Sequence, residues 1–234
     1  MDIFDIAIAR KLGGGGGSTG GGDSQLDALI DGSITEITSN ATKTRDGCFS
    51  GMQIEKVNMP LLTKLGNETF KNCLSLVDVY LPLVDRIGSS AVYGCKSLKN
   101  IDLPLATIMG QYAFRECVLL ESFNAPKLTG TLDTYTFYGC VALQFLDLHK
   151  ITGINSCSLK NCSNLNKIVL RSDTVVRLYN ADAFSGTPFA SGGTGGTAYV
   201  PQALIEEYKI ATNWSALYAQ GTCTFLPIEG SEYE

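Results

Sequence analysis

A cysteine recurs at a nearly constant interval through the middle of the chain, and this repeat constrains the fold more than any other feature. Successive repeat cysteines lie 22, 22, 23 and 22 residues apart, at Cys73, Cys95, Cys117, Cys140 and Cys162. Internal repeats of roughly 20 to 50 residues are typical of solenoids, in which one coil buries its apolar side only against its neighbours. The sequence therefore predicts a stack of coils.

Apolar residues keep fixed places after each cysteine. Those six and eight positions later are two apart, which is the spacing that puts side chains on one face of a strand. The first pair, Val57 and Met59, follows Gly51, which takes the place of the cysteine; the later pairs are Val79 and Leu81, Ile101 and Leu103, Phe123 and Ala125, Leu146 and Leu148, and Ile168 and Leu170. Each repeat is expected to hold one short strand, and a turn or tight helical segment returns the chain to the next coil.

Prolines and glycines mark the turns of the repeat. Proline has no N–H for a ladder bond and therefore ends a strand. It stands nine residues after the cysteine position in four repeats, at Pro60, Pro82, Pro104 and Pro126. Glycine recurs after the turn at Gly66, Gly88 and Gly110, and we expect a bend with positive φ there.

The repeated phrase, close to "aFxgCxsLxxvxLPxxtxIg", resembles the BspA-type leucine-rich repeat. The resemblance covers roughly residues 48–186; His149 and Arg171 replace the proline in the later copies. It implies an α/β repeat solenoid: a leucine-rich-repeat right-handed superhelix with a parallel concave sheet and helical terminal caps.

The chain divides into five expected segments. They are an N-terminal apolar segment (1–12), a glycine-rich linker (13–22), an N-terminal cap (23–47), leucine-rich repeats of about 22 residues (48–187) and a C-terminal cap (188–234). The linker holds eight glycines in ten residues, a composition typical of flexible tethers. Residues 1–12 are either a leader without structure or a segment that docks to a partner. In the C-terminal cap, Trp214 is expected in the core.

Composition excludes several classes of function. A net charge of −5 and the absence of a basic cluster argue against nucleic acid as a partner. No apolar run approaches the ~20 residues that span a bilayer, and no basic region precedes the apolar start, so a secretory signal peptide is not expected. These features leave the cell compartment unknown.

The eight cysteines favour free buried thiols, because five of them share one core-facing column. Disulfide bridges between neighbouring coils are the alternative. A metal site is the least favoured interpretation, because the sequence has no CxxC pair. The only histidine, His149, is expected at the end of a strand while Cys140 points into the core. We therefore expect no enzymatic activity, no catalytic residues, no metal and no cofactor.

The outward positions of the strands remain as a candidate binding surface on the expected concave face. The candidate residues are Asn58, Tyr80, Asp102, Asn124, Phe145 and Asp147. Repeat proteins commonly bind ligands on such faces, and exposed aromatic rings among polar groups suit a protein or carbohydrate ligand. The alternative is an ordinary solvated sheet face with two stray aromatic residues.

The resemblance implies adhesion at a bacterial surface or host interface by a non-enzymatic binding module. Two alternatives fit the missing signal peptide. The chain is then a virion or tail-associated component of a phage or prophage, tethered through its N-terminal segment, or an intracellular scaffold.

Overall fold

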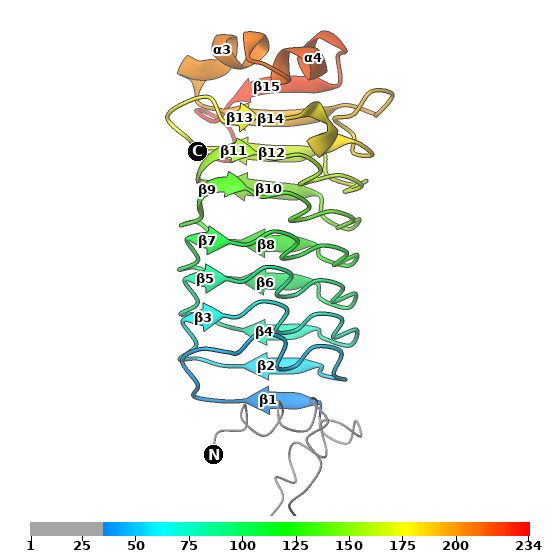
Figure 1. The fold of residues 1–234 in the computed structure, drawn as a ribbon. Helices are drawn as coiled ribbons and strands as arrows, with labels where there is room; N and C mark the ends of the chain where they lie inside the picture. The colour runs from blue at the N-terminus through cyan, green and yellow to red at the C-terminus, as the bar shows by residue number, and fades with distance from the viewer. Residues whose placement is uncertain (1–34) are drawn as a thin grey trace, which may run out of the picture.

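The structure is a computed structural model that describes residues 35–234. The chain forms a stack of parallel-stranded coils, with the strands of successive coils lying one above another (Figure 1). The predicted parallel-strand solenoid is therefore confirmed. The apolar segment 1–12, the linker 13–22 and residues 23–34 of the expected N-terminal cap lie outside the described residues.

One side of the stack is a long row of parallel strands, which we call the first row (Figure 1). Equivalent residues of neighbouring coils pair, as Val57 does with Val79. One sheet contains β1 (Glu36–Thr38), β2 (Lys56–Asn58), β4 (Asp78–Tyr80), β6 (Asn100–Asp102) and β8 (Ser122–Asn124). A second sheet continues the row with β10 (Phe145–Leu148), β12 (Lys167–Leu170), β14 (Gly196–Val200) and β15 (Cys223–Pro227).

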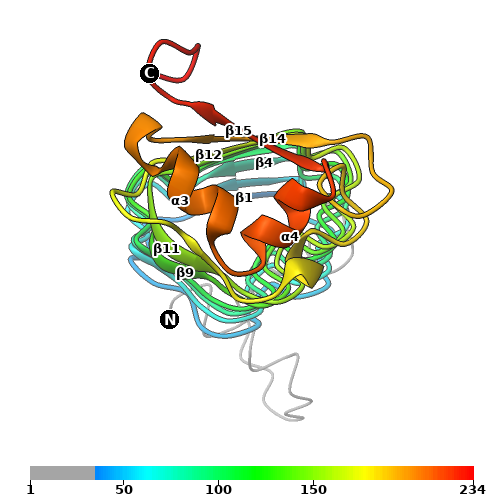
Figure 2. The same ribbon diagram turned by 90° about the horizontal axis from the view of Figure 1, so that it is seen from above.

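A second row of parallel strands lies across the core from the first (Figure 2). Its two sheets contain β3 (Lys64–Leu65), β5 (Arg86–Ile87) and β7 (Ile108–Met109), and β9 (Thr129–Leu132), β11 (Lys150–Ile154) and β13 (Arg177–Leu178). The sequence predicted only one strand per repeat. Strands of two residues, such as β3, are too short to show an alternating pattern, so the second row was missed.

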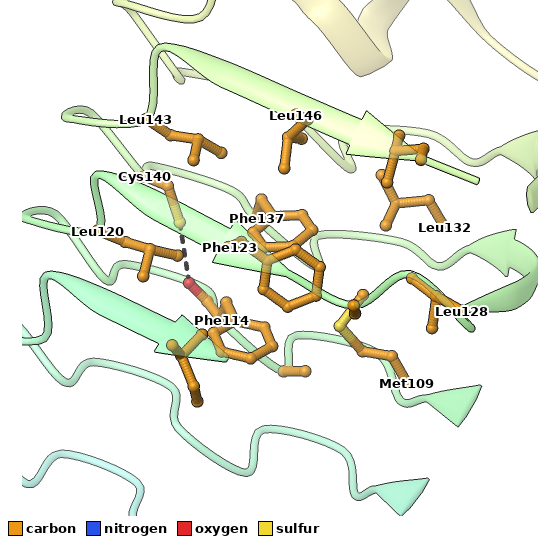
Figure 3. Close-up of a cluster of buried hydrophobic side chains, with 14 of the residues drawn as sticks. Met109, Phe114, Leu120, Phe123, Leu128, Leu132, Phe137, Cys140, Leu143 and Leu146 are labelled. Carbon is orange, nitrogen blue, oxygen red and sulfur yellow. Dashed lines mark hydrogen bonds between the residues drawn. The ribbon is translucent and has the colours of Figure 1, made fainter. Parts of the chain in front are cut away.

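Aromatic rings fill the space between the rows (Figure 3). Phe114 and Phe137 occupy the same position in adjacent coils and stack with ring centroids 5.4 Å apart. Phe123 packs edge-on against both, at 5.2 and 4.9 Å. Such edge-to-face and offset pairs add to the stabilisation that burial provides.

The repeat cysteines are buried, as their column predicts, and all eight cysteines of the chain carry free thiols. The Cys140 thiol donates a hydrogen bond of 3.1 Å to the backbone carbonyl of Phe114, one coil earlier (Figure 3). The same bond joins the other four to the preceding coil, with Sγ–O distances of 3.0–3.1 Å, at Cys73, Cys95, Cys117 and Cys162. The column therefore links each coil to the one before it.

Close packing, not positive φ, explains the recurring glycines, so that expectation was wrong. None of Gly66, Gly88 and Gly110 has a positive φ. A Cβ on Gly88 would lie 2.5 Å from the backbone nitrogen of Asn67, and one on Gly110 would lie 2.6 Å from that of Ser89. A side chain at these positions would push adjacent coils apart.

The C-terminal region continues the first row and covers its end. The short 3-10 helices are η1 (Ala181–Phe184) and η2 (Gln202–Leu204), and the α-helices are α3 (Ile205–Ile210) and α4 (Trp214–Ala219). The two α-helices lie over the last coil (Figures 1 and 2). Trp214 is fully buried, as predicted, and its indole N–H donates to the Val176 carbonyl at 2.7 Å. The right-handed sense of the superhelix and helical caps at both ends stay predictions.

Candidate functional site

The outward side chains of β2, β4, β6, β8 and β10 form the candidate site. We call them the strand face: Lys56, Asn58, Asp78, Tyr80, Asn100, Asp102, Ser122, Asn124, Phe145 and Asp147. Alternation along each strand produces this face, because the residue between two outward side chains points into the core. In β6, for example, Asn100 and Asp102 are exposed while Ile101 is buried.

Tyr80 is the most prominent aromatic group on the face. Its side chain is 58% exposed, and the register places it beside Asn58 on one side and Asp102 on the other. β1, β2 and β4 line a shallow depression of about 460 Å³ next to it. An aromatic ring that stands free among polar groups offers a large contact area to a ligand.

Polar side chains on neighbouring strands hold one another in place. The Asn124 side-chain amide donates to the Asp102 carboxylate at 2.7 Å, and the Ser122 hydroxyl donates to the Asn100 side-chain oxygen at the same distance. Groups that are already ordered lose less conformational entropy when a ligand binds. The middle of the strand face is therefore partly preorganised.

Phe145 and Asp147 have partners within the chain. The Phe145 ring stacks on Tyr233 with a centroid distance of 5.1 Å. The Arg171 guanidinium donates to both Asp147 carboxylate oxygens, from Nε at 2.9 Å to Oδ1 and from Nη2 at 2.8 Å to Oδ2. Four of the six predicted residues are thus exposed: Asn58, Tyr80, Asp102 and Asn124. The other two, Phe145 and Asp147, are partly covered by Tyr233 and Arg171, and sequence periodicity did not predict these contacts.

The sequence reasoning missed a cluster of four tyrosines around Arg115. The Arg115 guanidinium carbon lies 5.0–5.8 Å from the ring centroids of Tyr93, Tyr112, Tyr135 and Tyr138. Tyr112 and Tyr135 stack at 5.3 Å although both have φ of 60°, a conformation that bulky residues rarely adopt. The signal was present in the columns two and five residues before the repeat cysteines.

The described residues do not assemble a catalytic pair from the histidine and a repeat cysteine. His149 Nε2 lies 3.6 Å from the Asp147 carboxylate, whereas the Cys140 thiol is bonded to a core carbonyl. Burial raises the pKa of the Cys117 thiol to about 12, so this thiol keeps its proton at neutral pH. A protonated thiol is a poor nucleophile and metal ligand.

Two further features concern residues 35–234. This part of the chain contains no cluster of three or more His, Cys, Asp or Glu side chains placed to bind a metal ion. It also contains no helix with the length and hydrophobicity that crossing a membrane requires.

Comparison with protein families identifies the repeats. The model of the BspA type leucine rich repeat region matches residues 31–77 and 85–191, in six copies. Comparison with curated proteins finds no match.

Two solved structures resemble the chain. A leucine-rich repeat protein from Bacteroides ovatus ATCC 8483 is 20% identical, with a TM-score of 0.51 over 74% of this chain and 56% of that protein. A leucine rich cell surface protein from Faecalibacterium prausnitzii A2-165 is 19% identical, with a TM-score of 0.45 over 62% of this chain and 49% of that protein. The chain spans about half the length of these two proteins. The first likeness shows the fold alone.

Proposed function

Because the chain belongs to the BspA-type leucine-rich repeat family, we propose that it is a non-enzymatic binding module whose ligand contacts the strand face. The ligand is a protein or a carbohydrate. The exposure of Tyr80, with 58% of its surface accessible, is the observation that carries the proposal. Repeat proteins use their extended sheet faces in this way.

The chemistry around Tyr80 supports both ligand classes. A tyrosine ring packs against the apolar face of a sugar or against an apolar side chain, and tyrosine is enriched among the residues that dominate binding energy. Asn58 and Asp102 flank it, and Asn124 lies one strand beyond Asp102. Their amide and carboxylate groups supply both donors and acceptors to a ligand. The proposed contact region therefore centres on Tyr80 and extends toward Asn124.

The buried repeat thiols support a non-enzymatic role. The Cys95 thiol has its pKa raised well above the ordinary value by burial, and its hydrogen bond to the Phe70 carbonyl directs it into the core. These thiols are buried and serve packing between coils.

Binding to immobilised glycans and to extracellular matrix proteins tests the proposal. The wild type is compared with Tyr80→Ala and with Tyr179→Ala, which removes a 46% exposed tyrosine beside the second row. We expect Tyr80→Ala to weaken binding of the recovered ligand by at least about tenfold and Tyr179→Ala to leave it unchanged. Equal binding by all three proteins would contradict a role for the strand face.

We propose adhesion at a bacterial surface or host interface as the setting, as the resemblance to surface-associated repeats suggests. A virion or tail component held through residues 1–22, or an intracellular scaffold with reduced thiols, would use the same module elsewhere. An antibody against the native protein separates these settings. Signal on washed cells that brief protease treatment removes supports adhesion; signal only in virus-like particles or only in cytosol contradicts it.

A further inference from the structure

Residues 231–234, which we call the strap, turn back from β15 and lie against the outer side of the first row. In Figure 1 the chain reaches the level of β11 and β12 after leaving β15, and in Figure 2 this segment stands outside the sheet. Gly230 has a φ of 76° at the turn between β15 and the strap. Ile228 precedes the turn and is anchored by its N–H bond to the Val200 carbonyl at 3.0 Å.

The Tyr233 ring packs against aromatic side chains from two strands. Its ring stacks on Phe145 of β10 at 5.1 Å, with 17° between the planes, and meets Tyr199 of β14 edge-on at 4.6 Å. Val169 lies between these strands, and the register pairs it with the outward residues Asp147 and Tyr199. Val169 is nevertheless fully buried, so this part of the outer face is covered.

Two cations hold the strap from the same surface. The Lys167 ammonium donates to the Glu232 carboxylate and to the Tyr233 hydroxyl, both at 3.2 Å. The Arg171 guanidinium donates to the Tyr233 backbone carbonyl at 2.6 Å, while its hydrogen bonds to Asp147 fix its orientation. The surface thus recognises an aromatic ring, a phenol hydroxyl, a neighbouring carboxylate and a backbone carbonyl.

We propose that Phe145, Lys167, Val169, Arg171 and Tyr199 form a binding site for a short peptide turn that carries a tyrosine preceded by an acidic residue. The strap occupies this site within the chain, and a partner protein with a segment of the same chemistry replaces it. The site lies at the C-terminal end of the first row, and it does not depend on which ligand contacts Tyr80.

The strength of the strap contacts allows this exchange. The side chains of Glu232 and Lys167 are 64% and 43% exposed, and ion pairs that are open to solvent are individually weak. Release of the strap leaves β15 in the sheet, because the anchor at Ile228 lies before the turn. A segment on a short tether has an effective concentration in the millimolar range, so an isolated short peptide competes poorly with the strap of the wild type.

A peptide titration of full-length proteins tests the site. The opened receptor is Tyr233→Ala, and Tyr233→Gln is a second opened variant. The matched control, Tyr218→Ala, removes a 41% exposed tyrosine on α4. The probe is a capped peptide with the sequence of residues 228–234, IEGSEYE, and its counterpart IEGSEAE lacks the tyrosine. Binding is followed by ¹⁵N chemical shifts to millimolar peptide.

We expect both opened variants to bind IEGSEYE saturably. Their affinity should be at least about tenfold higher than that of the wild type or Tyr218→Ala, because the strap no longer competes with the peptide. Binding should perturb amides of β10, β12 and β14, weaken with added salt, and fall at least about tenfold for IEGSEAE and for Lys167→Ala/Tyr233→Ala. Equal affinity of wild type and opened variants, or no binding by the opened variants, would overturn the proposal. Neither result bears on Tyr80, whose ligand is tested separately.

Discussion

The thiol of Cys117 donates a hydrogen bond of 3.1 Å to the backbone carbonyl oxygen of Val92, one coil earlier. The residue is fully buried, so a side chain there must be small, largely apolar and able to donate. Cysteine meets all three conditions. Packing between coils therefore explains the column of cysteines.

Replacing this thiol tests the packing role. Cys117→Ala should lower the free energy of unfolding by about 1–3 kcal/mol, because it leaves a small cavity and removes a donor from a buried carbonyl. Urea denaturation measures the change. Lys96→Ala, at an exposed position one coil earlier, is the control and should stay within about 0.5 kcal/mol of wild type. A loss no larger than that of the control would contradict the role of the thiol.

The buried thiols also predict a loss of stability at alkaline pH. Desolvation by burial raises the pKa of Cys117 from 9.0 to about 12 and that of Cys48 to about 12. In the unfolded chain these thiols ionise above pH 9, whereas the folded chain keeps them protonated. Their contribution is complete below pH 9 and is lost as the pH rises from 9 to 12, at up to about 1.4 kcal/mol per pH unit for each thiol.

Urea denaturation at intervals from pH 8 to pH 11 measures this dependence. Cys117→Ala should show a shallower decline than wild type, since it has one fewer titrating thiol. Identical slopes for the two proteins above pH 9 would argue that this thiol is accessible in the folded state.

Two glycines of the second row, one directly after β5 and one within β9, should respond differently to substitution. Gly88→Ala should destabilise the protein by about 3 kcal/mol, because overpacking against backbone is relieved only by moving a coil. Gly130 has a positive φ of 75° but open space around it, so Gly130→Ala should cost only about 1–2 kcal/mol of local strain. Thermal and urea unfolding should therefore rank Gly88→Ala as the less stable protein. The reverse order would mean that backbone conformation matters more than coil spacing.

Neighbouring positions of the first row should respond oppositely to truncation. Ile101→Ala should cost about 2–5 kcal/mol, since this side chain is buried and its removal leaves a cavity. Tyr80→Ala should change the free energy of unfolding by no more than about 0.5 kcal/mol. A loss of several kcal/mol for Tyr80→Ala would place Tyr80 in the core and would remove it from the candidate site.

Periodicity explains which parts of the fold were predictable. The inward positions and the buried cysteine column follow from spacing, because every coil repeats the same environment. The shortest strands of the second row, such as Lys64–Leu65, leave no pattern of their own. The role of Gly88 depends on the distance to another coil, which spacing along the chain does not contain.

The candidate site divides in the same way. The exposure of Tyr80 follows from its outward place in a strand. The cover over Phe145 comes from Tyr233, which lies beyond the periodic region, so no repeat rule could pair the two. The tyrosines around Arg115 occupy turn columns with varied composition, and only a search of those columns would have brought them together.

Site-specific photo-crosslinking tests the binding role of the strand face most directly. A benzophenone amino acid replaces Tyr80 on the strand face in one protein and Ile108, which is 44% exposed on the second row, in another. Each protein is irradiated with the ligand recovered from the binding screen. We predict a cross-link from position 80 that excess unlabelled wild type abolishes, and none from position 108. A cross-link from position 108 alone would contradict the assignment of binding to the strand face.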